Sequence, residues 1–158
     1  MKTRIVLALA LILVLLMAGS ASVAAKGAVV PFQAYYHGGC QLLSFDPDAG
    51  VATYQVWGSG DATHLGNSNW SGVTSFNVYQ GPPFPYWSDD ITFTAANGDQ
   101  LFGTMEGTAT PPDVQGTFEV TGGTGRFAGV TGSGTFWAWT DGSGSNDHIW
   151  YAGTLTKP

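Results

Sequence analysis

The chain of 158 residues has one cysteine, only five lysines and arginines, and few charges of any kind. A single cysteine excludes an internal disulfide. Cys40 is expected to be buried as a small apolar residue or to bridge to another chain, because nothing near it pairs as the base and orienting group of a nucleophile. Eleven carboxylates outnumber the cations, so the chain cannot neutralise a phosphate backbone and nucleic acid is excluded as a partner.

Only one long hydrophobic run occurs, from Ile5 to Met17, and it is shorter than the roughly 20 residues that span a bilayer. Lys2 and Arg4 precede the run, and small residues follow it, which is the pattern of a signal sequence. Cleavage is predicted near Ala24 or Ala25. Residues 1–25 would then be a signal peptide and 26–158 a single domain, secreted to the periplasm or the cell exterior. Retention of the leader as an anchor stays open.

The apolar stripe of an amphipathic helix is also missing, since apolar and polar residues alternate with period two after Lys26. The alternation predicts strands at Val29–Tyr36, Gln41–Phe45, Val51–Trp57, Asp61–Leu65, Val73–Tyr79, Ile91–Ala96, Gln100–Glu106, Gly116–Thr121, Gly134–Thr140 and His148–Leu155. We expect some of them to merge across bulges into eight, for example where Gly58 and Gly60 interrupt a longer strand.

Turn signals separate these strands at short intervals. Asn97-Gly98 is a strong hairpin signal, and Asp46–Gly50, Pro111–Asp113 and Asp141–Gly144 mark further turns. Successive hairpins favour an up-and-down meander, and eight strands can close into a barrel that removes unprotected sheet edges. The predicted fold is therefore all-β: an eight-stranded antiparallel up-and-down barrel of the calycin-like kind.

Aromatic residues are plentiful, with six Trp, six Tyr and nine Phe, and most are expected in the core. A proline-stiffened loop at 81–86 and a final hairpin with rings on both faces suggest that some rings contact a ligand or another subunit. The candidate ligand-binding residues are Trp57, His64, Tyr86, Trp87, Trp137 and Trp139. Trp70 and Trp87 are expected to be harder to bury, and they would serve a surface or carbohydrate-binding role.

Candidate catalytic groups are sparse. A histidine buried inside a barrel can act as an acid or a base, so His64 with Asp61 or Glu106 forms the candidate catalytic set. Asp89 and Asp90 are adjacent and should point to opposite faces of a strand, which makes them a poor pair for glycoside hydrolysis.

Metal and cofactor motifs are lacking. His37, His64 and His148 show no ligand spacing, so no metal site is predicted, although zinc or copper bound by distant strands stays open. Calcium at Asp46/Asp48 or Asp141/Asp147 also stays open. The segment 123–128 matches a dinucleotide-binding glycine pattern, but the glycines after it forbid the helix which that site needs, so no cofactor is expected.

The most specific segment is a glycine-dense turn after the strand that ends at Thr121. Its residues are predicted to form a sharp structural corner, because glycine adopts positive φ without steric cost. They are Gly122, Gly123, Gly125, Arg126 and Phe127.

Three segments, Gly60–Gly66, Thr94–Asp99 and Thr121–Gly129, together resemble a largely uncharacterised family of secreted bacterial barrels related to plant allene oxide cyclases and dirigent proteins. The resemblance implies an eight-stranded antiparallel barrel, often oligomeric, with an apolar cavity that in the plant relatives steers cyclisation or coupling. The matching residues lie at turns and strand ends, so the resemblance carries the fold rather than the activity.

The sequence favours a secreted barrel that binds a small apolar or aromatic ligand in its interior, without clear catalytic machinery. Two alternatives stay open: an enzyme of the cyclase, isomerase or dirigent kind, and a surface, carbohydrate-binding or structural protein. A homo-oligomer, dimer or trimer, is a further expectation.

Overall fold

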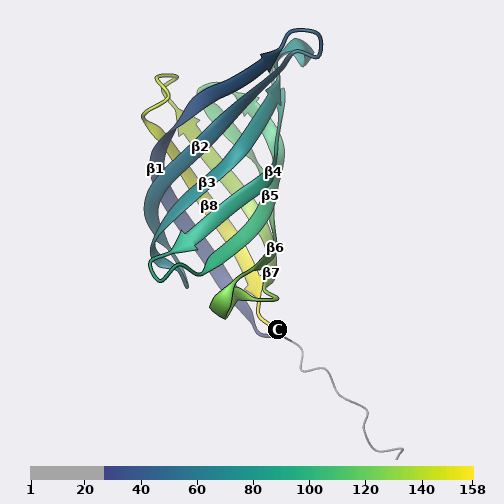
Figure 1. The fold of residues 1–158 in the computed structure, drawn as a ribbon. Helices are drawn as coiled ribbons and strands as arrows, with labels where there is room; N and C mark the ends of the chain where they lie inside the picture. The colour runs from purple at the N-terminus through teal and green to yellow at the C-terminus, as the bar shows by residue number, and fades with distance from the viewer. Residues whose placement is uncertain (1–26) are drawn as a thin grey trace, which may run out of the picture.

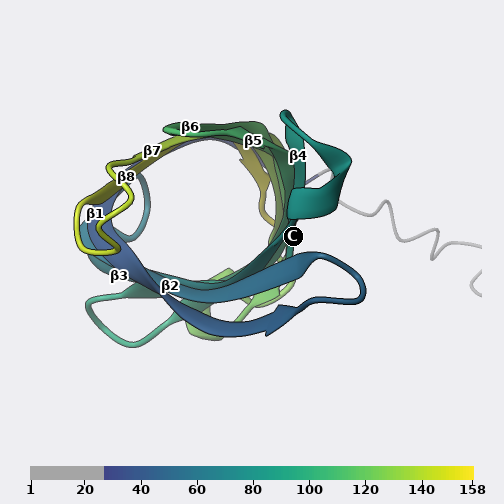
Figure 2. The same cartoon turned by 90° about the horizontal axis from the view of Figure 1, so that it is seen from above.

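The computed structural model describes residues 27–158, so the predicted signal sequence lies outside the described residues. Eight antiparallel strands close into one barrel in chain order, and Figure 2 shows the closed ring seen along its axis. The strands are β1 Val29–Asp46, β2 Val51–Ala62, β3 Gly66–Asn77, β4 Phe84–Ala95, β5 Gln100–Thr110, β6 Asp113–Gly123, β7 Thr131–Thr140 and β8 Asp147–Thr156. The predicted all-β, eight-stranded antiparallel barrel is confirmed. No helix within residues 27–158 is long and apolar enough to span a membrane.

The last strand pairs with the first, and this pairing completes the wall. β1 runs alongside β8 from Val29 opposite Thr156 to Gly38 opposite Asp147 without a register shift. Register shifts occur instead between β1 and β2, β3 and β4, β4 and β5, and β5 and β6. Closure leaves no exposed strand edge in the barrel, which matters because the sequence has few lysines that could protect such edges from pairing with other chains.

Alternate side chains of every strand point into the barrel and fill its middle with aromatic rings. Phe32, Phe93, Phe118 and Tyr151 are at most 2% exposed. Tyr151 meets Phe93 and Phe118 edge-on, with ring centroids 5.1 and 5.3 Å apart, which is a favoured geometry for aromatic pairs. The interior is therefore a packed core through most of its length.

The turns after β2, β4 and β6 share one end of the barrel, here called the closed end. The turn after β6 contains a short 3₁₀ helix, η2 (Gly125–Phe127), which carries Phe127 into the core. Phe127 and Val130 are each 1% exposed and pack with Leu65, Leu101 and Leu155. These side chains plug the closed end, where Figure 1 shows η2 as a short green helical turn near the C-terminus.

The glycine-dense turn docks on the β4–β5 hairpin. Gln100 N–H donates to Thr124 Oγ1 (2.9 Å), and Asp99 accepts from the Arg126 backbone N–H and pairs with its guanidinium at 3.6 Å. The Arg126 guanidinium also lies 4.9 Å from the centre of the Phe127 ring. Gly125 has φ of +53°, and a Cβ there would collide with the Asp99 carboxylate. Only glycine fits this corner.

The expected merging of candidate strands into eight is confirmed, since Val29–Tyr36 and Gln41–Phe45 are parts of the single strand β1. Two local predictions need correction. The expected bend at Gly58 and Gly60 is absent, because β2 keeps an unbroken register with β1 there. The expected strand Asp61–Leu65 is the end of β2 followed by a tight turn.

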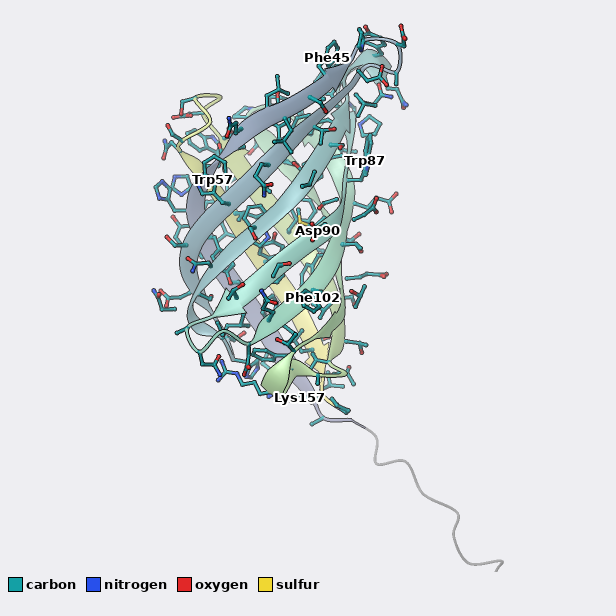
Figure 3. All side chains as sticks on the ribbon, viewed as in Figure 1. Phe45, Trp57, Trp87, Asp90, Phe102 and Lys157 are labelled. Carbon is teal, nitrogen blue, oxygen red and sulfur yellow. The ribbon has the colours of Figure 1, made fainter. Side chains whose placement is uncertain are left out.

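The aspartate pair on β4 also differs from expectation. A register shift between Ser88 and Ile91 leaves both Asp89 and Asp90 exposed, so they do not take opposite faces. Figure 3 shows Asp90 on the outer surface of the wall.

Candidate functional site

The other end of the barrel, where the turns after β1, β3, β5 and β7 gather, contains a small pocket; it is here called the pocket end. The pocket encloses about 80 Å³ and is partly open to solvent. Its lining is rich in aromatic rings contributed by several strands, including Tyr36, Tyr54, Trp70, Phe76 and Tyr86. The volume is far below the several hundred Å³ of a typical drug-sized site. The pocket thus has room for a small group only.

Cys40 and Asp147 bring polar chemistry into this pocket. Asp147 opens β8 opposite Gly38, and Cys40 follows two residues later on β1. Burial, with the neighbouring Asp147 carboxylate as a second cause, raises the pKa of Cys40 from 9.0 to about 12. A thiol with such a pKa is neutral at physiological pH, so Cys40 is not an activated nucleophile. The sequence predicted that Cys40 is buried, and the structure shows it only partly buried.

Two buried polar atoms of residues that line the pocket make no well-formed hydrogen bond within residues 27–158: Trp70 Nε1, which is near the Tyr151 hydroxyl, and Asp147 Oδ1, whose carboxylate is near the Cys40 thiol. Trp70 is only 6% exposed. Its neighbour Tyr151 directs its hydroxyl to the Met105 sulfur at 3.2 Å. Unpaired buried polar atoms are costly, so they mark a place where a ligand or water completes the bonding.

The tyrosines around the core are neutral hydrogen-bonding groups. Burial raises the pKa of Tyr36 from 10.0 to about 12, while its hydroxyl pairs with Ser68 Oγ at 2.9 Å. Burial also raises the pKa of Tyr86 and of Tyr151 well above the ordinary value. None of them can provide a phenolate near neutral pH.

The six candidate ligand-binding residues are distributed over three places. Tyr86 lies in the pocket, and Trp57 and Trp139 belong to its lining although their positions on β2 and β7 face outward. Trp137 lies on the outer surface. His64 and Trp87 lie in neither place, and Trp87 is half-buried on the outer side of β4 (Figure 3). Trp70, expected to be hard to bury, is a core residue.

The candidate catalytic set is not assembled. The interpretation of His64 as a buried residue is wrong: it sits exposed in the turn after β2 with φ of +69°, and its Nε2 donates to the Pro31 carbonyl at 3.0 Å. Asp61 and Glu106 are on outward-facing positions of β2 and β5. Among the described residues no hydrogen bond joins His64 to either carboxylate.

Outside the wall, a wide shallow groove of about 1130 Å³ crosses β2, β1, β8, β7, β6 and β5. Tyr35, Trp150 and Trp137 stand side by side along it, with ring centroids 5.1 and 4.5 Å apart. The Trp137 indole N–H donates to Asp113 at 3.1 Å, which fixes its ring. Asp61 and Glu106 are the carboxylates of the groove. This is the apolar outer face of the final hairpin that the sequence indicated.

Sequence reasoning missed Asp147, Tyr54 and Cys40 as pocket residues. The alternation of strand residues contains part of the signal, because it puts Tyr54 and Cys40 on the same face as the core positions of their strands. The proximity of Cys40 and Asp147 arises only when the first strand pairs with the last. No group of three or more His, Cys, Asp or Glu side chains in residues 27–158 is placed to hold a metal ion.

No family model and no curated protein sequence matches the chain. The fold is similar to solved structures of two dirigent proteins. The pterocarpan synthase dirigent protein GePTS1 gives a TM-score of 0.56 at 10% identity, covering 85% of this chain and 88% of that one. The pterocarpan synthase dirigent protein PsPTS1 gives 0.55 at 12% identity, covering 84% and 97%. The chain therefore has a dirigent-like β-barrel fold, and at this identity the likeness concerns the fold alone.

Proposed function

We propose that the protein binds a small, partly apolar molecule in the pocket at the pocket end of the barrel. The observation that carries the proposal is the pair of unpartnered buried atoms, Trp70 Nε1 and Asp147 Oδ1, in the lining of one aromatic pocket. The first donates and the second accepts, so the ligand has a hydrogen-bond acceptor and a donor on a compact ring. The two structural neighbours are named as pterocarpan synthases, and this is consistent with a barrel of this fold that accommodates small organic molecules.

The small volume limits the ligand. An apolar cavity of about 150 Å³ holds benzene, so a pocket of about 80 Å³ encloses a five-membered ring in part, with the remainder at the mouth. Binding without chemistry fits this site, because the Cys40 thiol is neutral and the tyrosines hold their protons. The proposal also includes that the protein is secreted and that it is related to the bacterial barrels which its sequence resembles.

Pyrazole and thiophene provide a matched test. Both are five-membered aromatic rings, but only pyrazole offers both an N–H donor and a nitrogen acceptor. We expect pyrazole, added with EDTA present, to change tryptophan fluorescence and raise Tm, and thiophene to bind at least tenfold more weakly. Asp147→Asn should weaken pyrazole binding about tenfold, whereas Asp61→Asn, on the outer face, should leave it unchanged. Equal binding of the two rings would refute the assignment.

A second candidate function concerns the outer groove: binding of a neutral carbohydrate. The adjacent rings of Tyr35, Trp150 and Trp137 supply apolar surface. The carboxylates of Asp61 and Glu106, together with several threonines and glutamines of the lining, supply hydrogen-bonding groups. No lysine or arginine belongs to the lining, which argues against an anionic ligand. Self-association through the groove is disfavoured, because the carboxylates of two copies of this acidic chain would repel each other.

The groove is tested with Trp150→Ala and neutral oligosaccharides. We expect wild-type binding that is insensitive to salt and is lost in the variant. If oligosaccharide binding weakens as the salt concentration rises, charge dominates the groove, and a cationic partner is the better assignment. A dimer or trimer seen by sedimentation, and lost in Trp150→Ala, would assign it to self-association.

A further inference from the structure

A second polar cluster lies outside the wall at the pocket end, where β1 pairs with β8. His37 and His148 are directly opposite each other in the register of this pair. Their ring centroids are 4.7 Å apart and the rings are inclined by 42°. The two side chains are therefore neighbours on one face, although 111 positions separate them in sequence. His148 also borders the pocket, but the proposed pocket ligand is bound through Trp70 and Asp147, and neither imidazole lines the groove.

Both histidines direct the same ring atom to one oxygen. Nε2 of His37 lies 3.2 Å from Asn146 Oδ1, and Nε2 of His148 lies 3.3 Å from the same atom. The orientation of the amide is fixed by chemistry, because its NH₂ group donates to the Asp141 carboxylate at 3.0 Å. Oδ1 must therefore be the atom that faces the two rings.

The loop that carries Asn146 is held against the barrel. Gly144 accepts a hydrogen bond from the Cys40 backbone N–H at 2.9 Å, and a Cβ on Gly39 would collide with the Gly144 carbonyl. Asp141 also accepts from the Ser143 backbone N–H at 2.8 Å. The amide oxygen is thus positioned by its surroundings before any ligand arrives.

The hydrogen bonds define the protonation of the histidines. Since an amide oxygen only accepts, both Nε2 atoms carry a proton. The Nδ1 atom of His148 is then bare and accepts from the Tyr35 hydroxyl at 2.8 Å. If the proton of His148 moves from Nε2 to Nδ1, the Nδ1–H group donates a hydrogen bond to the oxygen of the same hydroxyl, and Nε2 becomes free to bind a cation. A hydrogen bond of this kind orients metal-binding histidines.

We propose that His37 Nε2, His148 Nε2 and Asn146 Oδ1 form a binding site for a divalent transition-metal ion, Zn²⁺ or Cu²⁺, with water completing the coordination. Imidazole nitrogens suit both ions. Bonds of 2.0–2.1 Å in a tetrahedral site put the ligand atoms about 3.3 Å from one another. The two N···O distances, 3.2 and 3.3 Å, match this spacing, so the amide and either imidazole need little movement.

The test uses untagged full-length protein freed of metal by EDTA and then dialysed. Calorimetric titration with Zn²⁺ should give one ion per chain. His37→Gln and His148→Gln should each weaken binding at least tenfold, and Asn146→Ala several-fold. His64→Gln is the matched control, because His64 is exposed in a turn at the opposite end of the barrel and should leave binding unchanged. Far-UV circular dichroism verifies that each variant keeps the barrel.

Cu²⁺ gives an independent readout that does not depend on variants. Trp139 and Trp150 lie with ring centroids 5.8 and 5.9 Å from that of His148, so bound Cu²⁺ should quench tryptophan fluorescence. The electron paramagnetic resonance spectrum should show coupling to two imidazole nitrogens. A spectrum with one nitrogen or none, or Zn²⁺ affinity equally reduced by His64→Gln, would overturn the proposal.

Discussion

The two ends of the barrel are made from similar hairpins, yet they treat their polar atoms differently. At the closed end, the backbone N–H groups of Thr124 and Arg126 donate to the Gln100 carbonyl and the Asp99 carboxylate, and Phe127 fills the space beneath. At the pocket end, Trp70 and Asp147 each keep an unpartnered buried atom next to a cavity. One end is thus closed by paired polar groups and packed rings, whereas the other keeps polar atoms that, under the proposed function, a ligand would pair.

The segments that resemble the allene oxide cyclase and dirigent family all belong to the closed end. The β4–β5 hairpin at Asn97–Asp99 contacts the glycine-dense turn directly, and the turn after β2 contributes Leu65 to the same plug. The resemblance therefore records how the barrel is closed. None of the residues in these three segments lines the pocket, which explains why the resemblance predicted the fold and left the ligand open.

The largest effect is expected at the plug of the closed end. Phe127→Ala should lower the free energy of unfolding by about 3–5 kcal/mol, because a large buried side chain is replaced by a cavity. Urea denaturation measures the loss. Phe102→Ala is the control: Phe102 is an outward-facing residue of β5 (Figure 3), 36% exposed, and its loss should cost far less. Equal losses would mean that the closed end is not held by Phe127.

Alkaline pH should destabilise the whole barrel through buried groups of its pocket half. Burial raises the pKa of Cys40 and of Tyr36 to about 12, so between about pH 9 and 12 the unfolded chain ionises while the folded chain holds its protons. The unfolded state then binds fewer protons, so stability is complete below pH 9 and falls as the pH rises. Tm measured from pH 8 to 11.5 should fall, and Tyr36→Phe should flatten the fall.

The glycine corner offers a matched pair of substitutions. Gly125→Ala should cost about 1–2 kcal/mol, because φ is positive and the new methyl group meets Asp99. Gly122→Ala should cost little, since nothing lies within 4 Å of the position of its Cβ. Thermal unfolding of both variants is the measurement. A neutral Gly125→Ala would contradict the sharp-corner interpretation.

At the pocket end a substitution should have the opposite sign. Asp147→Leu removes a buried acceptor that lacks a partner, so we expect stability to rise by about 1 kcal/mol while pyrazole binding is lost. Urea denaturation and a fluorescence titration measure the two quantities on one sample. A loss of stability would show that Asp147 holds the barrel together rather than serving a ligand.

The smallest effect is expected for His64→Gln. The side chain is exposed, and its one hydrogen bond, to the Pro31 carbonyl, should be worth less than about 0.5 kcal/mol. Pyrazole binding should be unchanged. A large decrease in binding or in any turnover would restore His64 as a functional residue.

The sequence was sufficient for the architecture because its information is local. Period-two alternation and turns such as Asn97-Gly98 determine hairpins, and hairpins in series determine a barrel. Bulges limited this reasoning: one register shift put Asp89 and Asp90 on the same exposed surface. The positive φ at His64 turned a predicted strand into a turn.

The site could not be predicted because it depends on contacts between the ends of the sequence. Cys40 meets Asp147, and His37 meets His148, only through the register of β1 against β8. Nothing in either segment alone specifies that register. Trp70 was misjudged because its place in the core follows from the wall around it rather than from its neighbours in sequence.

The β1–β8 seam also has a kinetic consequence. Because it joins the first described strand to the last, it is the pairing of greatest sequence separation, and contacts of this kind slow folding. The ring cannot close until its last strand, the ten residues of β8, is in place. Metal capture by the histidine pair and ligand uptake beside Asp147 would then both report the moment at which folding is complete.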